Sequence, residues 1–201
     1  TATPTHDPTC ETTVASLIPA LEELERALRF ADTLIEEAND RMGLVPTVDT
    51  KRVVPMIQTK GKRTRCLAWF HPEHWSTQGG EMCQEINFCA EHLDRDPVDI
   101  VATVIHEKVH KWCHSLGIKV CAESGRHNKA FKRYAEYLGL EVAPITDGYG
   151  FGYTKPTPQL VERIENEFRP DARAFNLFRL IRPKNKQQSK NLRKWKCGGL
   201  D

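Results

Sequence analysis

One five-residue segment constrains the fold of this 201-residue chain more than any other. Residues 106–110 read His-Glu-Lys-Val-His and match the pattern H-E-x-x-H. In an α-helix, residues four apart lie about 40° apart around the axis and about 6 Å along it, so two such imidazoles can bind one zinc ion. We therefore expect a helix here, with His106 and His110 as zinc ligands and Glu107 beside them as the general base for a water molecule.

The sequence around this motif predicts a largely buried helix. Asp96 is a favourable N-cap, Pro97 suits the first turn, and Gly117 suits the end of the helix. Apolar residues recur between these limits: Val101, Val104, Ile105, Val109 and Trp112. Two histidines and a glutamate on such a helix indicate a function, the alternative being two structural histidines that are satisfied by hydrogen bonds.

A catalytic zinc ion usually takes three protein ligands and keeps one position open. His114 continues the four-residue spacing, but it lies about 12 Å from His106 along a continuous helix, too far to share the ion. The metzincin pattern requires Gly and His three and six residues after the second histidine. Cys113 and Leu116 occupy those positions here, which excludes that subclass.

The third ligand is therefore expected outside the motif helix. Glu123 and Glu136 are candidate carboxylate ligands. His127 is preferred, because it follows a turn at residues 124–126 and opens a helix that can fold back on the motif helix.

The predicted strands and helices along the rest of the chain indicate an α+β fold, because they follow one another without strict alternation. Three further segments have helical periodicity and end signals: residues 19–42, 127–138 and 158–168. Three short segments have strand composition: residues 51–58, 65–71 and 84–89. Pro55 indicates that the first strand lies at a sheet edge or carries a bulge. Residues 148–153, rich in Gly and Tyr, are expected to form a loop.

Cysteine usage indicates a reducing, intracellular environment. The chain has an odd number of cysteines and no C-x-x-C pair: Cys10, Cys66, Cys83, Cys89, Cys113, Cys121 and Cys197. We expect free thiols, most of them small core residues. No run of 18 apolar residues suggests a membrane span, so we expect no membrane partner and a cytoplasmic protein, associated with the nucleoid if its function is linked to DNA.

Charge is distributed unevenly along the chain. Residues 176–201 hold eight Lys and Arg residues and one Asp, a net charge of +7, and the whole chain carries +2, so the remainder carries −5. A second basic cluster precedes a predicted strand: Lys60, Lys62, Arg63 and Arg65. This asymmetry predicts a polyanionic partner such as nucleic acid, the alternative being a tail that only aids solubility.

The chain resembles the SprT-like family, which includes the Spartan DNA-repair proteases. The matching segments are Glu85-Ile86-Asn87, residues 101–110 around the motif, and residues 125–131, Gly-Arg-His-Asn-Lys-Ala-Phe. The resemblance covers roughly residues 45–155. It implies that His106, His110 and His127 bind zinc and that Glu107 is the catalytic base. It also implies a minimal zincin-like fold, in which a small three-stranded sheet packs on the motif helix with flanking helices.

The resemblance also suggests how the chain is organised. Four segments are expected: 1–44 with the long helix, 45–155 as the metalloprotease core, 156–175 as a C-terminal helix, and 176–201 as a basic tail. The run Lys194-Trp195-Lys196-Cys197-Gly198 is similar to the opening of the zinc ribbon that many members carry, so the tail is interpreted as a remnant of a truncated ribbon.

The sequence thus predicts an endopeptidase with one catalytic Zn²⁺, acting on protein or peptide substrates that are associated with or crosslinked to DNA. Tyr149 or Tyr153 is a candidate oxyanion donor, the alternative role of each being to pack a loop. DNA is an expected partner, preferably single-stranded, because Trp195 and Trp69 can stack on unpaired bases. The rival hypotheses are a zinc-stabilised nucleic-acid-binding module and a metal-dependent nuclease; Glu107 argues for peptide hydrolysis.

Overall fold

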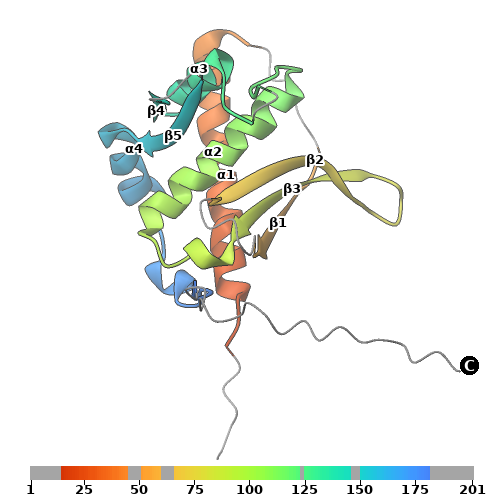
Figure 1. Ribbon diagram of the computed structural model, residues 1–201, viewed down its shortest axis with the longest axis vertical. Helices are drawn as coiled ribbons and strands as arrows, with labels where there is room; N and C mark the ends of the chain where they lie inside the picture. The colour runs from red at the N-terminus through yellow and green to blue at the C-terminus, as the bar shows by residue number, and fades with distance from the viewer. Residues whose placement is uncertain (1–14, 45–50, 60–65, 123–124, 146–149, 182–201) are drawn as a thin grey trace, which may run out of the picture.

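The computed structural model describes residues 15–44, 51–59, 66–122, 125–145 and 150–181. It is a mixed α+β structure with a three-stranded sheet and a separate two-stranded sheet (Figure 1), which confirms the predicted fold class. The helices are α1 (Ile18–Met42), α2 (Pro97–Ser115), α3 (Lys129–Tyr137) and α4 (Pro158–Arg163). The strands are β1 (Val53–Gln58), β2 (Ala68–Ser76), β3 (Met82–Cys89), β4 (Leu140–Pro144) and β5 (Phe151–Pro156). Short helical segments are η1 (Ala90–His92), η2 (Ile164–Phe168) and η3 (Ala172–Phe175).

The two long helices form the centre of the molecule, where α1 crosses behind α2 (Figure 1). Their apolar faces belong to one cluster of buried side chains that extends from Ala20 in α1 to Phe175 in η3. Asp96 caps α2 as predicted, accepting a hydrogen bond from the backbone N–H of Val98 at 2.8 Å. Lys108 of α2 is only 2% exposed, and its ammonium group pairs with Asp32 of α1. A carboxylate of α1 therefore neutralises the positive charge of Lys108.

The three-stranded sheet has the order β1-β3-β2, with β1 parallel and β2 antiparallel to β3. Pro55 lies in β1, an edge strand, as predicted. The second strand continues past its predicted end at residue 71 to Ser76, because β2 is also an edge strand and can accommodate Pro72. A register shift between His71 and Trp75 interrupts its pairing with β3. In Figure 1 the β2–β3 hairpin projects from the helices at one end.

The interpretation of residues 148–153 as a loop is wrong for its second half. Residues 151–153 begin β5, which pairs antiparallel with β4, a strand that the sequence pattern did not reveal. Gly150 and Gly152 lower the local strand propensity, and the partner that stabilises β5 lies seven residues before its start. His127 was expected to open the helix over residues 127–138, but α3 begins at Lys129. His127 instead pairs with Cys121 and Phe151 in isolated β-bridges.

The five cysteines in the described part of the chain are free thiols, as predicted, and three of them are buried: Cys83, Cys89 and Cys113. Cys10 and Cys197 lie outside the described residues. Among the helices of the described segments, none combines the length and apolar character needed to span a membrane.

Candidate metal centre

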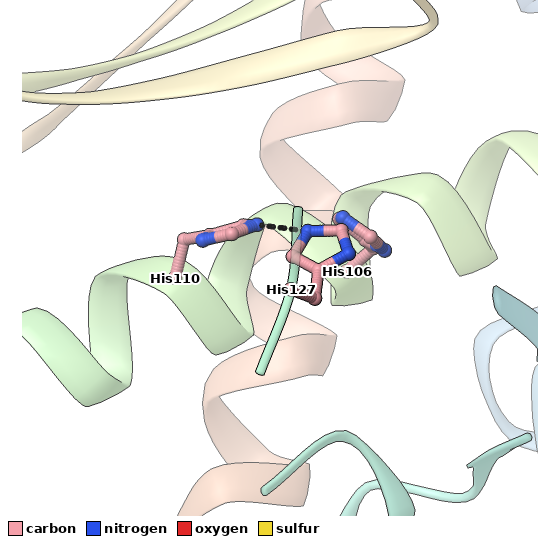
Figure 2. A group of neighbouring side chains, drawn as sticks. All are labelled: His106, His110 and His127. Carbon is pink, nitrogen blue, oxygen red and sulfur yellow. Dashed lines mark hydrogen bonds between the residues drawn. The ribbon is translucent and has the colours of Figure 1, made fainter. Parts of the chain in front are cut away.

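Three histidines converge at one side of α2 (Figure 2). His106 and His110 extend from successive turns of α2, and His127 approaches from the segment that precedes α3. One ring nitrogen from each lies within 4.8 Å of the others, so the group could hold a metal ion. Nε2 of His110 and Nε2 of His127 are 3.1 Å apart. Two nitrogens bound tetrahedrally to zinc would be separated by about 3.3 Å, close to this spacing.

A hydroxyl group on β5 orients the first histidine. Nδ1 of His106 lies 2.9 Å from Oγ1 of Thr154. This contact occupies Nδ1 and leaves Nε2 as the ring nitrogen available to a metal ion. A hydrogen-bond partner on the distal nitrogen is the usual support of a metal-binding histidine, because it fixes both the tautomer and the ring orientation.

The backbone of β5 fixes the position of His127. The N–H of Phe151 donates to the carbonyl of His127 at 2.9 Å, and the N–H of His127 donates back at 3.3 Å. Gly150 has φ +113°, and a Cβ there would lie 3.1 Å from the carbonyl oxygen of His127. A glycine is therefore required where the two segments meet. Asn128 then begins α3 by accepting a hydrogen bond from the N–H of Phe131 at 3.0 Å.

Phe131 forms an apolar floor beneath all three imidazoles. Its ring stacks on His127 with centroids 3.8 Å apart, and its centroid lies 4.8 Å and 4.9 Å from those of His106 and His110. The phenylalanine is fully buried. It therefore excludes water from one side of the histidine group.

Burial keeps the three imidazoles neutral. It lowers the pKa of His106 well below its usual value, with a further contribution from His110 and His127. Burial and the neighbouring His127 lower the pKa of His110 to about 3. Burial also lowers the pKa of His127, although the backbone of Gly152 and Phe151 opposes part of this shift. The neutral imidazole is the form that binds a metal ion, so this environment fits a cation that the histidines would share.

Nδ1 of His127 has no hydrogen-bond partner in the described part of the chain. Nδ1 of His127 is buried beside the backbone of Phe151 and Gly152, in no hydrogen bond of acceptable geometry. The ring is instead held by its stack on Phe131 and by the backbone bridges. The nitrogen that faces His110 is the one that fits a metal ion.

Glu107 lies in the same cleft as the three histidines. Its side chain is nearly buried, with 5% of the residue exposed. The cleft has a volume of about 580 Å³, and residues 66–70 and 152–156 form parts of its walls. Burial raises the pKa of the Cys121 thiol, and the carboxylate of Glu107 raises it further, which places this carboxylate near Cys121. A larger hollow of about 620 Å³ is lined by residues of α1, β1 and α2 and contains none of the three histidines.

The other candidate site residues lie at different places in the structure. His114 is not part of the histidine group; its ring contacts Phe70 at 5.8 Å between centroids. Glu136 is exposed on α3 and pairs with Lys132. Tyr153 is 73% exposed and lines the cleft. The remaining candidates lie outside the described residues: Lys60, Lys62, Arg63, Arg65, Glu123, Tyr149, Lys194, Trp195 and Lys196.

Three residues beside the histidines were not predicted from the sequence as functional. Arg95 and Thr154 line the cleft, and Phe131 packs against the imidazole rings. Phe131 follows His127 by four residues, which was an available signal. Arg95 directly precedes the N-cap of α2. Thr154 lies in β5, whose first three residues were interpreted as part of a loop. No family model, curated protein or solved structure matches the chain.

Proposed function

We propose that this chain is a zinc-dependent endopeptidase with a minimal zincin-like fold, similar to the SprT-like proteases. The observation that carries the proposal is the convergence of His106, His110 and His127 in one cleft with the carboxylate of Glu107. The proposed cofactor is one Zn²⁺ ion, because three neutral imidazoles are a common ligand set for catalytic zinc and leave a fourth position open.

The division of roles follows from the residues. Zinc held by the three imidazoles would supply Lewis acidity to the attacking water and to the scissile carbonyl. Glu107 accepts a proton from the attacking water and returns it to the leaving nitrogen, which converts a poor leaving group into an amine. Tyr153, which lines the cleft, would donate a hydrogen bond to the oxyanion. Thr154 holds the His106 ring in place.

An extended peptide is the substrate that suits the walls of this cleft. Residues 66–70 line it, and they include the start of β2. β2 is paired with β3 on one side only among the described strands. An edge strand offers unpaired backbone N–H and C=O groups to an extended chain, which can add to the sheet without any sequence-specific contact. This supports protein or peptide substrates over a nuclease reaction.

The charge distribution supports a second component of the proposal, that the substrates are proteins bound to nucleic acid. The basic residues of the last segment and of residues 60–65 would bring the enzyme to a polyanion. The rival binding module would use zinc only for stability. A structural zinc site normally has four protein ligands, whereas only three residues form the metal-binding group in the described part of the chain.

A metal and protease assay tests the proposal. Purified protein should contain one zinc ion per chain and cleave an unfolded protein such as casein, losing activity with a chelator and regaining it with added Zn²⁺. Glu107→Gln is the matched variant, because the amide cannot accept the proton of the water while all three histidines remain. We expect zinc content to be unchanged and cleavage to fall at least about a hundredfold. Full cleavage by this zinc-loaded variant would disprove the role of Glu107.

A further inference from the structure

Arg95 places a positive charge in the wall of the cleft. Its side chain lies between η1 and α2 and lines the same cavity as the three histidines. Nε donates to the carbonyl of His92 at 3.0 Å, and Nη2 donates to Oγ1 of Thr103 at 3.0 Å. A longer contact of 3.4 Å joins Nη1 to the carbonyl of Asp99. These contacts hold the guanidinium in one orientation before any ligand binds.

This charge has no ionic partner in the described part of the chain. All three acceptors of Arg95 are neutral oxygens, and none of the ion pairs within 4.0 Å includes it. A guanidinium has five N–H groups, so two remain for a ligand. Burial lowers the pKa of Arg95, against the opposing effect of Asp99 and Asp94, but arginine stays protonated in proteins. A partly buried cation whose hydrogen-bond acceptors are all neutral oxygens favours an anionic ligand.

The position of Arg95 relative to the metal centre sets where such a ligand would lie. Its partner Thr103 precedes His106 by three residues on α2, which corresponds to about 4.5 Å along the helix. An extended peptide advances about 3.3 Å per residue, so an offset of about 4.5 Å corresponds to one or two residues of a bound peptide. Lys155 is a second cation in the lining of the cleft, next to Thr154 on β5 and opposite Glu141 of β4.

We propose that Arg95 selects substrates with an acidic side chain, glutamate or aspartate, one or two residues from the scissile bond. The carboxylate of that side chain accepts hydrogen bonds from the free N–H groups of Arg95, and Lys155 adds to the positive potential. Arginine is well suited to this role, because its planar fork matches a carboxylate. This selectivity rests on the proposed peptidase function and adds the substrate class to it.

The competing explanation is that Arg95 only ties the segment after η1 to α2. A structural tie would affect stability and the cleavage of all substrates alike. A specificity residue instead changes the ratio between an acidic and a neutral substrate. The ratio is therefore the measurement that separates the two roles, and it does not depend on how much protein is active.

The experiment compares matched peptides with the zinc-loaded full chain. Each pair is identical except for Glu or Gln at one position within three residues of the cleaved bond. We expect kcat/KM to favour the Glu peptide by about tenfold or more at one position. Arg95→Gln should bring the ratio near one, Arg95→Lys should retain part of it, and Arg95→Glu should shift the preference to a Lys peptide. Equal cleavage of both peptides at every position, with no change in Arg95→Gln, would overturn the inference and leave the peptidase function intact.

A binding measurement keeps the test independent of catalysis. Fluorescent Glu and Gln peptides are titrated against zinc-loaded Glu107→Gln protein, with and without Arg95→Gln. Tighter binding of the Glu peptide that is lost in the Arg95 variant would support the inference even if no peptide were cleaved, in which case only the peptidase proposal would fail. If an oligonucleotide displaces the Glu peptide and itself loses binding in Arg95→Gln, the residue serves a phosphate and the inference is wrong.

Discussion

At the scale of single residues, the site depends on how each imidazole is supported. Thr154 occupies the distal nitrogen of His106, whereas His127 is held by a stacked phenylalanine and by backbone bridges. Burial then keeps all three rings neutral, which is the state that a metal ion requires.

His127→Ala is expected to lower zinc occupancy far more than His114→Ala. His127 presents Nε2 to His110 at 3.1 Å, while His114 lies a further turn along α2 and contacts Phe70 instead. Metal analysis of the two purified proteins, with circular dichroism to confirm folding, measures the difference. A larger loss of zinc in His114→Ala would reassign the third ligand.

Thr154→Val should weaken zinc binding by about tenfold to a hundredfold, the usual effect of losing a partner on a ligating histidine. Valine has nearly the same shape but cannot hydrogen-bond to Nδ1 of His106. Thr154→Ser keeps the hydroxyl and is the control. Competition with a chelating dye gives the affinity of each protein. Equal affinities for Val and Thr at this position would show that packing alone orients the ring.

At the scale of elements, α2 joins the metal centre to the rest of the core. One side of this helix carries the histidines, and another carries Lys108, which is buried and pairs with Asp32 of α1. The long N-terminal helix α1 packs against α2. It covers the back of the motif helix and neutralises a charge there.

Asp32→Asn is therefore expected to destabilise the protein. The change removes a carboxylate partner of a buried lysine, and because Asp32 itself is about half exposed we expect a loss of about 1–2 kcal/mol in the free energy of unfolding. Glu22→Gln, at an exposed position of the same helix, is the matched control. Urea denaturation of both variants provides the comparison. A loss no greater than that of the control would show that Asp32 contributes little.

At the scale of the whole molecule, the main feature is the separation of charge between an acidic body and a basic C-terminal segment. The described structure ends at residue 181, and the segment beyond it holds seven basic residues and one acidic residue: Arg182, Lys184, Lys186, Lys190, Arg193, Lys194, Lys196 and Asp201. Binding through such a segment releases counterions from phosphates, so its affinity should fall steeply with salt and depend weakly on sequence.

A chain that ends at Ile181 should lose most of its affinity for single-stranded oligonucleotides, together with most of the salt dependence. This end point keeps the contact between the N–H of Arg179 and the carbonyl of Ala90, so the body should stay folded. Fluorescence anisotropy at two salt concentrations, with single- and double-stranded oligonucleotides, tests the prediction. Unchanged affinity and salt slope in the shorter chain would mean that the segment aids only solubility.

Features that depend on local geometry could be predicted from the order of the residues alone. The spacing of His106 and His110 fixes their common side on a helix, because residues four apart always lie close together there. The N-cap at Asp96, the edge position of Pro55 and the long amphipathic helix follow equally local rules. The choice of His127 drew on the expectation that its segment folds back and also on the family resemblance, and the structure places this residue before α3 and not within it.

The contacts that complete the site arise only when segments distant in the sequence pack together. Thr154 reaches His106 from 48 residues away, and Arg95 enters the cleft because η1 and α2 meet beside it. β5 owes its existence to β4 and to the bridge with His127, not to its own composition. Contacts of this kind depend on how whole elements pack, and a short polar side chain carries no local signal of the distant partner that will use it.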